Sequence, residues 1–173
     1  MKKLESTWYN MALVLTGIAV VAGAALGYVN SITAPTIEAI KTQLEKAAEL
    51  EVLNGQEGTA IKVTDPKGFG GALTVMVGLA QDGTVLGYKV LESSETPGLG
   101  AKADFWFQEG QKGNIIGKTA GKLEVSKDGG DVDAITASTI TSRAFLRCIN
   151  AAYEKLSESN ADGQSGATIK GER

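Results

Sequence analysis

Four hydroxyl side chains lie within six consecutive positions of the stretch DAITASTITSRAF, residues 133–145. Apolar residues at helical spacing follow them, so the hydroxyls lie at a predicted helix start. Ser and Thr can accept hydrogen bonds from the free N–H groups there, and capping alone would explain them. The same N–H groups and the helix dipole also attract an anion, and Arg143 would add charge-assisted bonds. A phosphate could therefore bind here, or be esterified to a threonine. The four hydroxyls belong to Thr136, Ser138, Thr139 and Thr141.

The side-chain inventory of the 173 residues narrows the possible chemistry, because there is no histidine and only one cysteine. The lack of histidine excludes Ser-His-Asp and Cys-His catalysis, histidine-ligated haem and most zinc sites. One thiol can neither form an internal disulfide nor hold an iron–sulfur cluster. Redox chemistry would therefore need an organic cofactor. The net charge is −3 and no basic cluster stands out, so no nucleic-acid partner is expected.

A segment near the N-terminus is long and apolar enough to cross a membrane as a helix. No charged residue lies between positions 6 and 37, and the apolar centre covers residues 11–29. Trp8 and Tyr9 lie at one end and Tyr28 at the other, as in the aromatic belts of membrane proteins. The sequence therefore predicts a single membrane anchor.

The charges beside this segment predict its orientation. Lys2 and Lys3 precede it, and Glu38 is the first charge after it. By the positive-inside rule the N-terminus is cytoplasmic and the rest of the chain lies outside. A cleaved signal peptide is the alternative, since AGA at positions 22–24 resembles a cleavage site. Both interpretations export the domain that follows.

A second helix is expected directly after the anchor. Pro35 should end the membrane helix or lie just beyond it. Residues 36–53 then have apolar side chains at helical spacing, and Asn54 and Gly55 should end this helix. It would connect the membrane to the exported domain.

The middle of the chain predicts strands. Residues 73–79 alternate apolar side chains, and residues 85–91 form a second strand after the turn signal Asp82-Gly83. Another short strand is expected in GKLEV, residues 121–125. The aromatic residues 105–107 are best explained by packing in or beside the core.

The end of the chain predicts an amphipathic helix and then a polar tail. Cys148 lies on the apolar face of that helix, which indicates a buried, unreactive thiol. From Ser157 on there is too little apolar surface to pack, and a mobile tail is expected. The face consists of Phe145, Cys148, Ile149, Ala152 and Leu156.

The sequence resembles the FMN-binding domain family, which includes the G subunit of the Rnf electron-transport complex and the C subunit of the sodium-translocating NADH:quinone oxidoreductase. The family's signal for covalent flavin attachment is an aspartate, two spacers, Ser or Thr, usually Gly and Ala, and then Thr. Asp133, Thr136 and Thr139 match it, while Ala137 and Ser138 stand where Gly and Ala are usual. The match extends over most of the chain, and the Rnf G subunit is closer in length and loop size.

The resemblance implies a set of site residues. A flavin transferase would use FAD to attach FMN through its phosphate to Thr139, and Asp133 and Thr136 would be its recognition elements. The second family element, ETPGLG at positions 95–100, is expected near the flavin. Ser138 and Arg143 would help to hold the phosphate, and the ring or ribityl chain would border Glu95, Thr96, Gly98, Leu99 and Gly100.

The tail offers another possible acceptor. DGQSGAT, residues 162–168, fits the attachment signal as a string but lacks the following apolar helix. Thr139 is therefore the expected acceptor, and Thr168 is a possible second one.

The expected fold class is α+β. A single transmembrane helix would precede a small exported FMN-binding domain with an antiparallel sheet flanked by helices. The expected boundaries are 1–35 for the cytoplasmic N-terminus and anchor, 36–58 for the connecting helix, 59–157 for the FMN-binding domain and 158–173 for the tail.

The implied function is that of an electron carrier without catalytic residues of its own. By resemblance, covalent FMN would relay electrons in a complex of the inner membrane that couples ferredoxin and NAD to ion transport. Its partners would be the other membrane subunits and the flavin transferase. The alternatives are the C subunit of the quinone oxidoreductase, another exported flavoprotein, or a cofactor-free anchored binding or structural module.

Overall fold

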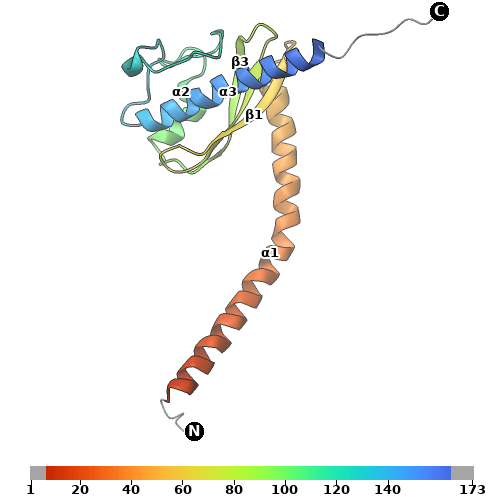
Figure 1. Ribbon diagram of the computed structural model, residues 1–173, viewed down its shortest axis with the longest axis vertical. Helices are drawn as coiled ribbons and strands as arrows, with labels where there is room; N and C mark the ends of the chain where they lie inside the picture. The colour runs from red at the N-terminus through yellow and green to blue at the C-terminus, as the bar shows by residue number, and fades with distance from the viewer. Residues whose placement is uncertain (1–6, 165–173) are drawn as a thin grey trace, which may run out of the picture. The chain divides into compact units, whose positions relative to one another are not determined.

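The computed structural model describes residues 7–164, with side chains to residue 160. The chain forms two compact units that divide between Gln43 and Leu44. The second unit contains the end of the first helix and all later elements (Figure 1). In chain order the elements are α1 (Trp8–Leu53), β1 (Thr59–Asp65), β2 (Leu73–Leu79), β3 (Val85–Ser93), η1 (Gly100–Lys102), α2 (Ala103–Trp106), η2 (Ser126–Asp128) and α3 (Thr139–Gln164).

Helix α1 is one continuous helix, so the expected break near Pro35 is wrong. A proline inside a helix removes one backbone hydrogen bond, here the one to the carbonyl of Ser31. Close by, Ser31 Oγ donates to the carbonyl of Tyr28 at 2.8 Å and Thr33 Oγ1 donates to that of Val29 at 3.0 Å, so neither side chain replaces the lost bond, and the helix continues without it. The helix is long and apolar enough to cross a membrane, and its end at Leu53 agrees with the predicted stop.

The sheet has three antiparallel strands in the order β1-β2-β3. The predicted hairpin of β2 and β3 is confirmed. Its turn is closed by the Gly83 N–H, which donates to the carbonyl of Ala80 at 3.0 Å, and Gly83 has a φ of +85° that favours glycine. Strand β1 was not expected. Only Val63 and Asp65 are buried in this edge strand, so its alternating signal is weak.

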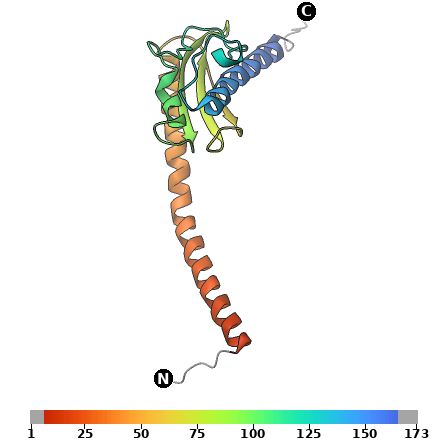
Figure 2. The ribbon, with the colours of Figure 1, turned by 90° about the vertical axis from the view of Figure 1, so that its left-hand side faces the viewer.

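Central strand β2 is buried on both faces, which explains why all seven residues are inaccessible. One face packs against α3 and carries the alternating apolar residues, as predicted. The other face packs against the end of α1 (Figure 2). There Met76 forms a small buried cluster with Ala48 and Val52. A Cβ at Gly78 would overlap the backbone of Val52, so this close approach needs glycine. The alternating residues are Leu73, Val75, Val77 and Leu79.

The strand expected in residues 121–125 is absent, because this segment makes only an isolated bridge between Val125 and Val132. Leu123 and Val125 are nevertheless buried. Their alternation therefore reflects a loop whose apolar side chains anchor in the core, and not strand pairing.

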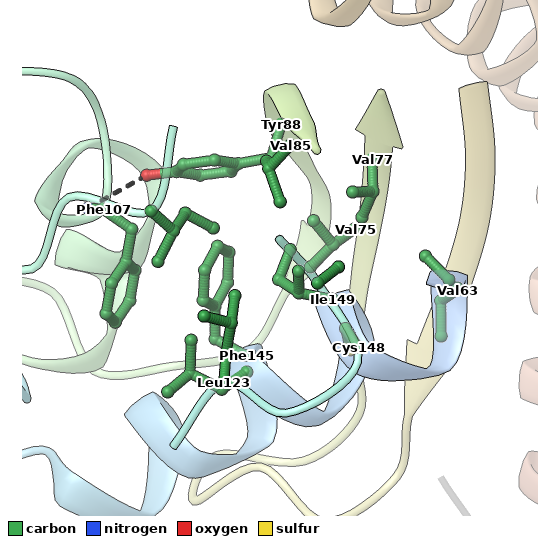
Figure 3. Packing of buried hydrophobic residues seen from close by; sticks show 14 of the residues in the cluster. Val63, Val75, Val77, Val85, Tyr88, Phe107, Leu123, Phe145, Cys148 and Ile149 are labelled. Carbon is green, nitrogen blue, oxygen red and sulfur yellow. Dashed lines mark hydrogen bonds between the residues drawn. The ribbon is translucent and has the colours of Figure 1, made fainter. Parts of the chain in front are cut away.

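Aromatic side chains fill the centre of the core (Figure 3). The rings of Phe107 and Phe145 stack with centroids 4.3 Å apart, and Tyr88 meets Phe145 edge-on at 4.7 Å. The Tyr88 hydroxyl donates to the carbonyl of Ala103 at 2.9 Å and accepts from the N–H of Phe107 at 3.2 Å. Of the predicted aromatic group, Phe107 is core, whereas Phe105 is half-exposed.

Helix α3 presents the predicted apolar face to the core, and all five of its members are buried. Burial raises the pKa of the Cys148 thiol to about 12, so the thiol stays protonated at neutral pH, as expected of an unreactive core residue. The helix continues to Gln164, into the segment that was expected to be a mobile tail. Thr168 lies outside the described residues.

Candidate functional site

A tight turn places the hydroxyl cluster at the start of α3. The Ser138 N–H donates to the carbonyl of Ile135 at 3.0 Å, and Ala137 has a φ of +62°. A positive φ at the third residue of a β-turn is characteristic of a type II turn and favours glycine. Thr139 then becomes the first residue of α3.

The first turn of α3 keeps its backbone donors free. The first helical N–H to be bonded is that of Ser142, which donates to the carbonyl of Ser138 at 3.0 Å. Between residues 7 and 164, no carbonyl or side chain accepts a hydrogen bond from the N–H of Thr139, Ile140 or Thr141. Three converging N–H groups at the positive end of a helix dipole favour an anion.

A pocket of about 350 Å³ lies against this helix start. Three of its lining side chains, Phe69, Leu99 and Ile140, are large, apolar and 70%, 41% and 49% exposed. The pocket therefore offers apolar surface to a ligand beside the free N–H groups. It is lined by Phe69, Glu95, Thr96, Leu99, Gly100 and residues 137–141.

Glu95 is the charged residue in this lining, and it is buried. Its Oε2 accepts a hydrogen bond from Thr141 Oγ1 at 2.9 Å, while Oε1 has no partner in the described structure. A Cβ at Gly100 would overlap Oε2, and one at Gly68 would come within 2.8 Å of Oε1. The two glycines thus leave room for a carboxyl group that carries an unused acceptor.

The hydroxyls differ in their partners, so capping alone does not describe them. Thr139 Oγ1 accepts a hydrogen bond from Lys127 Nζ at 3.2 Å, and Thr141 binds Glu95. Ser142, next in sequence, donates to the carbonyl of Ser138 and accepts from the N–H of Ile135, both at 2.9 Å, which fixes the turn.

The structure brings six of the ten predicted site residues to one pocket and places four elsewhere. Asp133 and Thr136 line a neighbouring pocket on the other side of Ala137. Gly98 is a turn residue with a φ of +79°, in a Pro-Gly turn that brings Leu99 to the pocket. The six are Glu95, Thr96, Leu99, Gly100, Ser138 and Thr139.

Arg143 is the fourth residue placed elsewhere. It donates from Nε and Nη2 to the two carboxylate oxygens of Asp128 at 2.6 and 2.7 Å. These hydrogen bonds hold the pKa of Asp128 below its ordinary value. Arg143 is thus committed to an ion pair, although it lies one turn after Thr139.

Three residues at the site were not expected from the sequence. Phe69 is a large aromatic residue between glycines in a loop, a pattern that could have indicated a ligand contact. Ile140 follows Thr139 directly. Lys127 carries no such signal, because its approach to Thr139 depends on how η2 packs beside α3.

Comparison of the sequence with known proteins shows which family the chain belongs to. Residues 68–154, half of the chain, match the model of the FMN-binding domain. The G subunit of an ion-translocating oxidoreductase complex from Vibrio atlanticus is 35% identical over 136 residues, covering 76% of this chain and 65% of the relative. Its counterpart from Yersinia pestis is 39% identical over 100 residues, or 48% of that relative's length.

A third relative is matched almost completely. It is the G subunit of the Na(+)-translocating ferredoxin:NAD(+) oxidoreductase complex of Acetobacterium woodii, 30% identical over 91% of this chain and 98% of the relative. With the first two relatives the chain aligns over only about half to two thirds of their length. The chain belongs to the FMN-binding domain family, together with the G subunits of ion-translocating oxidoreductase complexes.

The residues of the pocket fit FMN. The cofactor combines a flat ring with apolar faces, a polyol chain and a phosphate. Phe69, Leu99 and Ile140 offer apolar contact for the ring, and Glu95 Oε1 is an unused acceptor in the lining. The free N–H groups of α3 suit the phosphate. A volume of about 350 Å³ lies within the range of roughly 300–1,000 Å³ common for ligand pockets.

Proposed function

We propose that the protein carries FMN on a phosphodiester to Thr139 Oγ1 and relays electrons as a subunit of a membrane-bound, ion-translocating oxidoreductase. The observation that carries this proposal is the position of Thr139. Its side chain lies where a pocket with apolar walls meets the free N–H groups of a helix start. A phosphate attached there leaves the rest of the cofactor free to extend along the pocket.

The attachment is a phosphoryl transfer from FAD, catalysed by a flavin transferase. Thr139 Oγ1 attacks the phosphorus of the FMN half, and an Oγ–P bond forms. The pyrophosphate P–O bond breaks, AMP leaves with the bridging oxygen, and the hydroxyl proton passes to the transferase or solvent. The α3 N–H groups would stabilise charge on the phosphoryl oxygens.

The cofactor and the chain would have different roles in electron transfer. Bound FMN supplies one- and two-electron transfer, and the chain supplies binding, orientation and shielding. The apolar side chains cover the ring, Glu95 and Thr141 offer hydrogen-bonding groups, and α3 holds the phosphate. Asp133 and Thr136 lie on the other side of Ala137, where a transferase could contact them.

The proposal also covers the partner subunits of the protein and its location in the membrane. The relatives are named as subunits of ion-translocating complexes, and one name specifies Na⁺, ferredoxin and NAD⁺. We infer that the other membrane subunits donate and accept the electrons. The N-terminus would be cytoplasmic and the FMN domain would lie on the outer side of the inner membrane. A covalent link matters there, because a dissociated cofactor could not be replaced from the cytoplasmic pool.

Replacing the proposed acceptor tests the function. Thr139→Val removes the oxygen at nearly constant volume, so the fold should persist while covalent flavin is lost. Full-length protein produced with the transferase is denatured and weighed by mass spectrometry, with Thr168→Val as the matched control. Loss of flavin only in Thr168→Val would move the site to the tail. A flavin-free wild-type chain would favour the cofactor-free module.

A further inference from the structure

Lys127 lies beside the proposed attachment oxygen. Its Nζ donates a hydrogen bond to Thr139 Oγ1 at 3.2 Å, across twelve positions of sequence. It also lines the neighbouring pocket with Asp133 and Thr136. The hydroxyl therefore has an ammonium group on one side and the free N–H groups of α3 at its base.

The residues on both sides of Lys127 are fixed to the surrounding structure. Before it, the N–H of Ser126 donates to the carbonyl of Val132 at 2.8 Å, and Ser126 Oγ donates to Asp133 Oδ1 at 3.2 Å. After it, Asp128 forms its two hydrogen bonds with Arg143 of α3. The 3₁₀ turn is thus tied to α3 one turn after Thr139, which holds the backbone of Lys127 close to Thr139.

We propose that Lys127 orients the Thr139 hydroxyl for flavin attachment and is the charge partner of the phosphodiester afterwards; this inference rests on the proposed covalent FMN. As the Oγ–P bond forms and AMP leaves, negative charge builds on the phosphoryl oxygens. An ammonium group next to the attacking oxygen stabilises that charge. The product is a monoanion, and it keeps the same partner.

This role explains why Arg143 need not reach the phosphate. Its guanidinium is occupied by Asp128, and that ion pair positions the turn that carries Lys127. Arg143 would therefore act on the attachment site indirectly, as a positioning residue.

The rate of flavin attachment tests the proposal. Purified full-length variants in detergent are incubated with the transferase and FAD, and the flavin-bearing fraction is followed by intact mass. Lys127→Gln should slow attachment about fivefold, the size expected of one solvent-exposed charge interaction. Lys127→Arg should restore most of the rate. Lys122→Gln is the matched control, because it removes the same charge from an exposed site away from Thr139.

Salt supplies a second readout that a merely structural role would not change. The advantage of wild type over Lys127→Gln should shrink as NaCl is raised, since ions screen an exposed charge. Equal rates for Lys127→Gln and Lys122→Gln, with wild type fully modified, would overturn the role of Lys127 and leave the proposed function intact. An unmodified wild-type chain would instead overturn the proposed function.

Discussion

Ala137 adopts a backbone conformation that few non-glycine residues adopt. Its φ of +62° belongs to the turn that delivers Ser138 and Thr139 to the helix start. Left-handed backbone costs an L-residue with a side chain about 1–2 kcal/mol. The attachment signal that the sequence resembles usually has glycine at this position, and the turn would explain that preference.

Ala137→Gly should therefore stabilise the protein. Releasing the left-handed strain outweighs the roughly 0.4–1 kcal/mol that glycine's freedom in the unfolded chain costs, so the net gain in unfolding free energy should be up to about 1.6 kcal/mol. Denaturant unfolding of the full chain in detergent measures it. Ala101→Gly, at an exposed position with ordinary φ, should lose stability. A loss of the same size at position 137 would contradict the turn assignment.

Thr141 and Glu95 lie beneath the pocket, and their contact predicts a second effect. Thr141→Val removes the hydrogen bond to Oε2 and leaves both oxygens of a buried carboxyl group without a partner. An unpaired buried group costs about 1–3 kcal/mol, and a loss of that size is expected in the free energy of unfolding. The exposed Thr136→Val should change it by less than about 0.5 kcal/mol. Equal effects would mean that the Thr141–Glu95 contact contributes nothing.

At the scale of elements, an ion pair joins the end of β1 to α3. Arg147 Nε donates to Asp65 Oδ2 at 2.6 Å, and the Lys67 N–H donates to Asp65 Oδ1 at 2.6 Å. Burial acts to raise the pKa of Asp65, but these hydrogen bonds outweigh it and lower the pKa below its ordinary value of 3.8. The carboxylate therefore stabilises the fold above that value, and this contribution is lost as the pH falls through the lowered pKa.

Asp65→Asn should remove this pH dependence. The melting temperature of wild type should exceed that of the variant near neutral pH, and the difference should shrink as the pH falls from about 5 towards 2. Thermal unfolding followed by circular dichroism across that range measures it. A difference that stays constant with pH would show that the carboxylate's charge does not stabilise the link between β1 and α3.

The elements also show what the sequence could predict. The hairpin and the α3 face were predictable, because a Gly turn and long apolar periodicity are local signals. Edge strand β1 was missed because it buries few side chains. GKLEV was mistaken for a strand because Leu123 and Val125 alternate with exposed residues, as in a strand, although they belong to a loop that buries them in the core. Lys127 could not be predicted, since only tertiary packing brings it to Thr139.

At the scale of the whole molecule, the charges beside the membrane segment predict orientation. Alkaline phosphatase fused after Arg173 should be active, and a fluorescent protein fused there should be dark, because the C-terminal domain would be exported. Replacing Lys2 and Lys3 with glutamate should weaken this bias. A fluorescent fusion with inactive phosphatase would place the domain in the cytoplasm and contradict the proposed topology.

The most direct test of the account is to locate the flavin on the chain. Trypsin cuts after Lys127 and Arg143, so residues 128–143 form one peptide that contains Thr139, while residues 156–170 contain Thr168. In protein produced with the transferase, tandem mass spectrometry should find the mass of FMN less water on the first peptide, at Thr139. An unmodified first peptide would contradict the central claim.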